Sequence, residues 1–260
     1  TIPHSELMKR VRTRIADGRV LRLIESFLTQ GVMEEMKTWT PTAGSPQGAV
    51  ISPLLSNVYL DPLDHEMAER GHEMVRYADD FVILCRSREE AEAALQHVQT
   101  WTTQAGLTLH PAKTRIADLN EPGGFDFLGY HFERDRRNPQ RILRWPREKS
   151  QRKLKNALRE RTPRRCGQSL LTITAQLNRT LRGWYEYFQH TNVTTVFPSL
   201  DGWLRRRLRR ILLKRHKCHH HNGLGTAHQR WPNEYFAKLG LFNLTTAHAL
   251  ARQSARAVNH

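Results

Sequence analysis

Residues 75 to 85 read Val-Arg-Tyr-Ala-Asp-Asp-Phe-Val-Ile-Leu-Cys and constrain the fold more than any other stretch of the chain. Two short runs rich in β-branched and aromatic residues flank two adjacent aspartates, which is the pattern of a tight β-hairpin. Neighbouring side chains in a strand point to opposite faces, but at a hairpin tip Asp79 and Asp80 can reach one side of the sheet. Two carboxylates held there repel each other unless a cation lies between them, so the pair is a candidate Mg²⁺ site. On these two residues alone, an exposed turn between ordinary strands is the simpler interpretation.

A second feature lies upstream, where residues 44 to 60 combine a loop with the start of a helix. Glycine and proline fix unusual backbone angles in the run Gly44-Ser45-Pro46-Gln47-Gly48. From Ser52-Pro53 onward, apolar residues recur at helical spacing behind a capping residue and a first-turn proline. Gln47 at the mouth of this helix can reach a base edge or a sugar, while Gly48 lets a nucleic-acid backbone approach. Taken alone, the segment is only a capped loop.

Further segments extend the pattern and carry a family resemblance. Downstream of the hairpin come Gly106-Leu107-Thr108-Leu109, Lys113-Thr114 and the run from Gly124 to Tyr130. In order and spacing, the segments resemble the palm motifs of the group II intron-encoded reverse transcriptase/maturase family. The match is to motif B at 44–60, motif C at 77–80, motif D at 107–114 and the primer-grip element at 127–130. Leu177-Asn178, the run Leu181 to Tyr185, and Tyr187-Phe188 resemble the core of the family's thumb/maturase region.

The resemblance implies a role for each matching residue. Asp79 and Asp80 would be catalytic metal ligands for two Mg²⁺ ions, with Mn²⁺ as a substitute, and Tyr77 would lie near the primer terminus. Ser45, Pro46, Gln47 and Gly48 would border the nascent base pair and the template. Lys113 would act as an acid or charge stabiliser for the departing pyrophosphate, and a plain surface lysine is the equal alternative. The primer strand would be positioned by Phe127, Leu128, Gly129 and Tyr130.

The fold class predicted from this alternation of helices and short strands is α+β. We expect a right-hand polymerase palm over 1–146, which is an antiparallel sheet with helices on one face. A basic α-helical thumb/maturase bundle is expected to follow over 147–217, and a basic C-terminal extension over 218–260. Helices are expected in 5–30 (two), 53–69, 88–105, 148–161, 169–189 and 199–216. Strands are expected near 32–40, 107–109, 114–118, 125–133 and 141–144, in addition to the hairpin around Asp79.

The family's first metal-binding aspartate lies on a strand that runs directly into a segment like Thr1-Ile2-Pro3-His4. The resemblance therefore implies that this aspartate and most of the fingers fall outside residues 1–260. On that interpretation the chain is a fragment or the downstream half of a split protein, is inactive alone as a polymerase, and has an upstream fragment of the same protein as a partner.

The positive charge is confined to the C-terminal part of the chain. The net charge is +16, yet residues 1 to 100 hold 11 Lys+Arg against 15 Asp+Glu, whereas residues 101 to 260 hold 30 against 10. This imbalance favours a polyanion-binding appendage, and nucleic acid is favoured over a membrane surface because no amphipathic apolar face accompanies the basic residues. The predicted RNA-binding residues are Arg152, Lys153, Lys155, Arg205, Arg206, Arg207, Arg209, Arg210, Lys214 and Arg215.

Cysteine content and hydropathy indicate the cellular location that we expect for the protein. Three scattered cysteines, Cys85, Cys166 and Cys218, favour a reducing cytosol over a disulfide framework, and no stretch reaches the ~20 apolar residues of a membrane span. We expect a bacterial cytosolic, nucleoid-associated location. The Cys218–His228 stretch matches no standard zinc module, so a glycine-containing linker is favoured over a metal site.

The sequence therefore predicts an RNA-directed DNA polymerase (reverse transcriptase) of group II intron type with RNA-splicing (maturase) activity. Its partners would be intron RNA, an RNA template/DNA primer duplex and dNTP. One alternative is an RNA-binding maturase, or a split or inactive fragment, without polymerase activity. Another is a CRISPR-associated or diversity-generating reverse transcriptase. The sequence does not indicate an oligomeric state.

Overall fold

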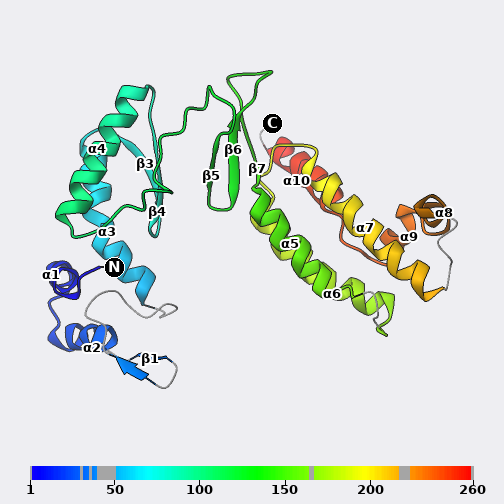
Figure 1. Ribbon diagram of the computed structural model, residues 1–260, viewed down its shortest axis with the longest axis horizontal. Helices are drawn as coiled ribbons and strands as arrows, with labels where there is room; N and C mark the ends of the chain where they lie inside the picture. The colour runs from blue at the N-terminus through cyan, green and yellow to red at the C-terminus, as the bar shows by residue number, and fades with distance from the viewer. Residues whose placement is uncertain are drawn as a thin grey trace. The chain divides into compact units, whose positions relative to one another are not determined.

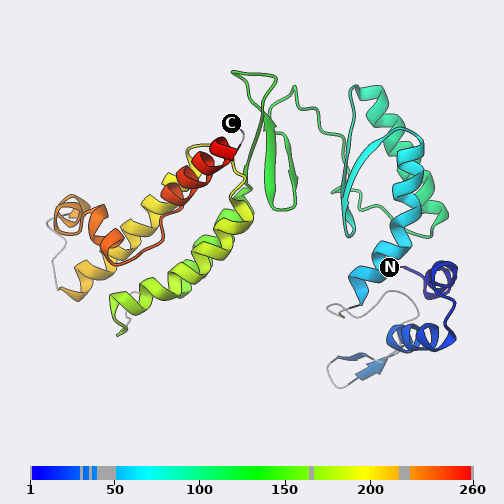
Figure 2. The same cartoon turned by 180° about the vertical axis from the view of Figure 1, so that it is seen from behind.

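The computed structural model describes residues 2–29, 32–34, 37–39, 51–163, 167–216 and 223–258. Its contacts divide the chain into two compact units, Thr1–Asp118 and Leu119–His260, which are described separately (Figures 1 and 2). None of the described helices is long and apolar enough to cross a membrane.

The first unit combines helices with two small hairpins. Helices α1 (His4–Arg14) and α2 (Gly18–Thr29) precede the antiparallel pair β1 (Val32–Glu34) and β2 (Lys37–Trp39). Helix α3 (Ser52–Glu69) leads into the antiparallel hairpin of β3 (Glu73–Tyr77) and β4 (Asp80–Leu84), and α4 (Arg88–Gln104) follows. Ser87 caps α4 by accepting a hydrogen bond from the backbone N–H of Glu90, which satisfies one of the free donors of its first turn.

Helix α3 organises this unit because it contributes to two apolar clusters. Leu55 and Tyr59 pack with buried residues of α1 and α2, including Leu7 and Ile24. One turn further along, Leu60, Leu63 and Met67 pack with Ala94, Val98 and Trp101 of α4 and with the inner face of the β3–β4 hairpin. The hairpin is thereby fixed against α3 and α4, beside which it is drawn in Figure 1.

The second unit is a three-stranded sheet followed by helices. Strands β5 (Phe125–Phe127), β6 (Tyr130–Arg134) and β7 (Ile142–Pro146) pair antiparallel in that order. The helices are α5 (Glu148–Glu160), α6 (Leu170–Phe188), α7 (Val196–Arg215), α8 (Gly223–Arg230), α9 (Asn233–Lys238) and α10 (Leu244–Val258). Their apolar stripes form one core, whose fully buried members include Ile173, Leu177, Leu204 and Leu208.

The described elements agree with an α+β class of helices and small antiparallel sheets, and each expected helix is present. Four expectations were wrong. The strand expected over 32–40 is the antiparallel pair of β1 and β2. Residues 107–109 and 114–118 form no strand. The strand expected over 125–133 is a hairpin, because Leu128 and Gly129 turn the chain with φ of 47° and 80°. The linker expected before His228 is helical from Gly223, where Ala227 is buried in the core of the second unit.

Candidate functional site

The Asp79–Asp80 pair lies at the tip of the predicted hairpin, which the structure confirms. Strands β3 and β4 pair from Glu73–Leu84 to Tyr77–Asp80, so Ala78 and Asp79 are the two turn residues. Both aspartates are exposed, and the Tyr77 side chain beside them is 67% exposed. The apolar core gains nothing from these carboxylates, which remain available to a ligand.

The Arg76 side chain ties this turn to α3. Its Nη1 donates to the Ala78 carbonyl oxygen at 2.8 Å and to Asn57 Oδ1 at 3.0 Å. Its Nε donates to Asp64 Oδ1 at 2.8 Å, and Nη2 donates to the other Asp64 oxygen. These hydrogen bonds with Asp64 raise the pKa of Arg76 further above its usual range, so the guanidinium stays charged.

The chemistry of the two carboxylates suits a hard divalent cation. Mg²⁺ is usually bound by one or two carboxylates, with water and substrate phosphates as the other ligands. In the part of the chain that the structure describes, no three or more His, Cys, Asp or Glu side chains gather to hold a metal ion. Asp79 and Asp80 would therefore supply only some of the ligands of such a site.

For Lys113 and the motif B residues, the structure gives no test of the predicted roles. Lys113 is exposed, in a turn where its backbone N–H donates to the His110 carbonyl at 3.0 Å. Its role as an acid or charge stabiliser stays a prediction. The motif B residues Ser45, Pro46, Gln47 and Gly48 lie outside the described residues.

The predicted primer-grip residues form a tight turn in the second unit. Ser150 Oγ on α5 donates to the Gly129 carbonyl at 2.9 Å, and the Tyr187 hydroxyl on α6 donates to the Leu128 carbonyl at 2.8 Å. In return, the Tyr130 hydroxyl donates to the Tyr187 carbonyl at 2.7 Å. Burial raises the pKa of Tyr130 to about 12, so this hydroxyl stays protonated and remains a donor at neutral pH.

A Cβ atom at Gly129 would lie 3.3 Å from Ser150 Oγ and 3.4 Å from Phe188, so the turn approaches α5 and α6 closely. Glycine serves two needs at once here, the positive φ and the close packing. The turn is thus anchored to the helices that follow it.

The predicted RNA-binding side chains differ in exposure. Arg152, Lys153, Arg206, Arg210, Lys214 and Arg215 are exposed, whereas Lys155, Arg205 and Arg207 are half-buried. Arg207 donates to the Thr162 carbonyl at 2.7 Å, and Lys155 Nζ lies 6.0 Å from the centre of the Trp203 ring. Arg206, Arg210 and Lys214 recur every four residues, so they form one exposed basic row on α7.

Arg209 differs from the expectation because the structure places it inside the second unit. Arg209 is only 1% exposed. Nε donates to the Trp231 carbonyl at 2.8 Å, Nη2 donates to Asn233 Oδ1 at 2.9 Å, and the guanidinium lies 5.2 Å from the centre of the Phe236 ring. As placed here, the side chain is not available to a phosphate.

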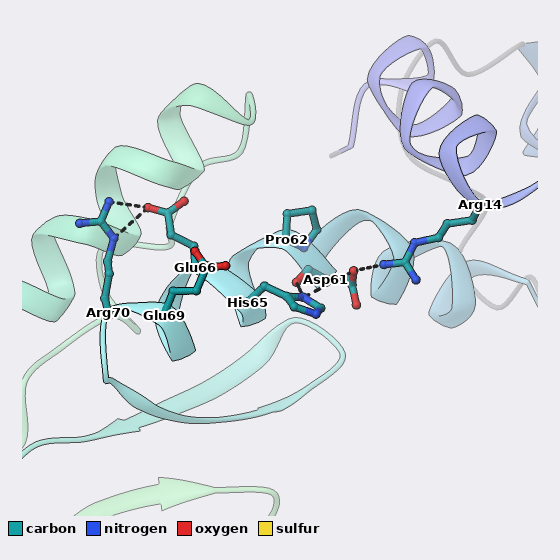
Figure 3. A pocket seen from close by; sticks show the side chains of 7 residues that line it. All are labelled: Arg14, Asp61, Pro62, His65, Glu66, Glu69 and Arg70. Carbon is teal, nitrogen blue, oxygen red and sulfur yellow. Dashed lines mark hydrogen bonds and ion pairs between the residues drawn. The ribbon is translucent and has the colours of Figure 1, made fainter.

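A pocket on α3 includes none of the predicted site residues. Figure 3 shows its lining, which is Arg14, Asp61, Pro62, His65, Glu66, Glu69 and Arg70. Glu66 pairs with Arg70 at 2.8 Å and Asp61 pairs with Arg14 at 2.5 Å. These charges neutralise one another along the helix surface.

Comparison with known proteins decides the family. The reverse transcriptase (RNA-dependent DNA polymerase) family matches residues 1–132, half of the chain, including the Asp79–Asp80 turn. The chain belongs to the reverse transcriptase family. The group II intron, maturase-specific domain matches residues 151–231, which include most of α5 and all of α6 and α7.

Several curated proteins are similar to this reverse transcriptase chain. Protein YkfC of Escherichia coli (strain K12) is 30% identical over 171 residues, covering 52% of this chain and 44% of that protein. An uncharacterized 91 kDa protein in cob intron of Schizosaccharomyces pombe is 38% identical over 177 residues, covering 45% and 22%. The group II intron-encoded protein LtrA of Lactococcus lactis is 38% identical over 63 residues, covering 24% and 10%. The chain matches less than half the length of each of these relatives.

Sequence reasoning missed the residues that hold the two turns of this reverse transcriptase chain. Arg76 had a detectable signal, because the alternation of β3 places it on the same face as Met74, which packs against the core. An arginine at such a position needs a partner. Asn57, Asp64 and Ser150 carried no comparable signal, since their contacts depend on how α3 and α5 pack.

Proposed function

We propose that this chain supplies the catalytic turn and the RNA-binding helices of a group II intron-type RNA-directed DNA polymerase that also assists splicing of its intron RNA. The observation that carries the proposal is the exposed Asp79–Asp80 turn within the segment that matches the reverse transcriptase family. The basic helices of the maturase-specific match support the RNA-binding part.

Nucleotidyl transfer joins an incoming dNTP to a primer 3′ oxygen, and two bound Mg²⁺ ions would stabilise the charge on the attacking and leaving oxygens. Asp79 and Asp80 would hold these ions from the hairpin tip. Tyr77, exposed beside them, would contact the primer terminus. The Leu128–Gly129 turn would position the primer strand, because its backbone is fixed by Ser150 and Tyr187.

The polymerase proposal is tested by primer extension on an RNA template with the complete gene product. Asp79→Asn and Asp80→Asn should each abolish cDNA synthesis, because each removes a charged metal ligand. RNA binding should persist in both variants, since each substitution removes a negative charge and no basic phosphate-binding side chain. Synthesis at the wild-type rate by either variant would refute the assigned role of that aspartate.

The RNA-binding proposal is tested with the basic row on α7. Arg206→Ala, Arg210→Ala and Lys214→Ala together should lower the slope of log affinity against log salt by about 2 to 3, since each phosphate contact contributes ~0.7–0.9. Affinity at moderate salt should fall on the order of tenfold or more.

The matched control removes three exposed arginines of the first unit, Arg19, Arg22 and Arg86. It lowers the net charge equally, so an equal loss of affinity would show that only total charge matters and would refute the assignment to α7. A maturase without polymerase activity is the alternative function that the same experiments address. RNA binding without any cDNA synthesis by the complete gene product would select it.

A further inference from the structure

The backbone of the catalytic turn is in an unusual conformation. Ala78, directly before Asp79, has a φ of 55°, in the left-handed region that L-residues with a Cβ atom rarely adopt. The strand ladder ends at the Tyr77–Asp80 pair, so the ladder itself does not fix the Ala78 carbonyl. A strained turn of this kind persists only where the surroundings hold it.

The restraint comes from one side chain, Arg76, whose guanidinium reaches three acceptors. It donates to the Ala78 carbonyl in the turn and to Asn57 and Asp64 on α3. Asn57 and Asp64 are seven residues apart, two helical turns, and therefore lie on the same face of α3. The planar fork of arginine can satisfy such a set at once, whereas the single ammonium of lysine cannot reproduce its geometry.

Burial separates this network from ordinary surface ion pairs. The Arg76 side chain is 10% exposed, whereas the Arg70 side chain, which pairs with Glu66 further along the same helix, is 46% exposed. The Arg70–Glu66 pair, drawn in Figure 3, links α3 only to its own C-cap residue. The Arg76 network joins two elements, helix α3, whose first half lies in the motif B segment, and the turn that carries the aspartates.

We propose that Arg76 is a positioning residue of the polymerase, which, with Asn57 and Asp64, fixes the Ala78 carbonyl and thereby the direction of the Asp79 and Asp80 carboxylates. This inference rests on the proposed polymerase function for its catalytic consequence, but its structural part does not. Arg76 acts through the turn backbone and touches no reacting atom.

The structural part is tested by amide hydrogen exchange on the 1–260 chain. Arg76→Lys and Asp64→Asn should each speed exchange of the turn amides around Asp79 and Asp80 at least tenfold. Peptides from α4, which packs below the hairpin, should keep their wild-type exchange. Glu66→Gln is the matched control, because it removes an ion pair of the same helix and should leave the turn unchanged.

The catalytic part is tested by primer extension with the complete gene product. Arg76→Lys and Asp64→Asn should lower kcat at least tenfold while the KM for dNTP and the affinity for RNA change less than threefold, because the substrates still bind but the carboxylates are misdirected. Asn57→Ala, which removes one of the three acceptors and leaves the ion pair, should give a smaller loss of kcat in the same direction.

Unchanged exchange at the turn in both Arg76→Lys and Asp64→Asn would overturn the proposal. Exchange that rises equally in the turn and in α4 would also overturn it, since that result describes a general loss of packing. A wild-type gene product without cDNA synthesis would refute the polymerase function, while the exchange experiment would still decide whether Arg76 holds the turn.

Discussion

Replacing Arg209 by alanine should destabilise the second unit by about 4 kcal/mol, although the residue lies within a run of arginines. The structure gives this arginine an interior role. It joins α7 to the segment between α8 and α9 through the Trp231 carbonyl and to α9 through the Asn233 side chain. Burial lowers its pKa, and the neighbouring Arg205 lowers it further, so the interior hydrogen bonds offset a real cost of burying the charge.

The magnitude follows from what the substitution leaves behind. The buried Trp231 carbonyl loses a charged donor, at about 1–3 kcal/mol, because it cannot recover its hydrogen bond from water, and the exposed Asn233 side chain loses a hydrogen bond worth about 0.5–1.5 kcal/mol. The contact with the Phe236 ring adds roughly 1 kcal/mol. Arg206→Ala and Arg210→Ala are the controls, since both side chains are exposed and should change stability by less than about 0.5 kcal/mol.

The assay is urea unfolding of the 1–260 chain, followed by amide exchange in peptides from α7 and α9 so that the second unit is read separately. With a slope of about 2 kcal/mol per molar, a loss of 4 kcal/mol lowers the midpoint of this unit by about 2 M. A midpoint within about 0.3 M of the wild type for Arg209→Ala would refute the interior role. So would an equal loss in the Arg206→Ala control.

Three further substitutions or conditions have expected outcomes. Gly124→Ala should destabilise the second unit by at least about 3 kcal/mol in urea unfolding, because the new Cβ would meet the Phe132 carbonyl oxygen at 1.9 Å and φ is 48°; wild-type stability would contradict this. Tyr130→Phe should cost about 1 kcal/mol in the same assay by removing the hydrogen bond to the Tyr187 carbonyl, and no loss would show that the bond is neutral. Burial and Arg252 lower the pKa of His248 in the folded protein. The second unit should therefore keep full stability above about pH 6.5 and lose stability as the pH falls below that value. Unfolding measured at several pH values tests this, and His248→Gln should abolish the dependence.

The helices and the catalytic hairpin were predictable because their signals are local. The apolar spacing of α4 predicted 88–105 against the observed Arg88–Gln104, and the capping serine marks its start. The Asp79 hairpin follows from two β-rich runs around a two-residue turn. Neither element needs information from distant parts of the chain.

The errors arose where tertiary packing decides. Arg209 was expected on the outer surface of α7 because the basic residues there seemed to share one face. The segment before His228 was expected to be a linker because it contains glycine and matches no zinc module, whereas α8 and α9 contact α7 and cover Arg209. The two errors are connected, since a linker would have left that side of α7 open to water.

The turns of motif C and of the primer grip have a common construction. Among the described residues, Ala78 and Leu128 are the two non-glycine residues with positive φ, and each lies in one of these turns. Each also has its carbonyl held by a side chain donor, Arg76 for Ala78 and Tyr187 for Leu128. In both turns the restraint on this carbonyl comes from a side chain rather than from the strand ladder. In the proposed polymerase, strain at these two points would keep the Asp79 and Asp80 carboxylates and the Leu128–Gly129 backbone in fixed directions, which in-line nucleotidyl transfer requires of its binding groups.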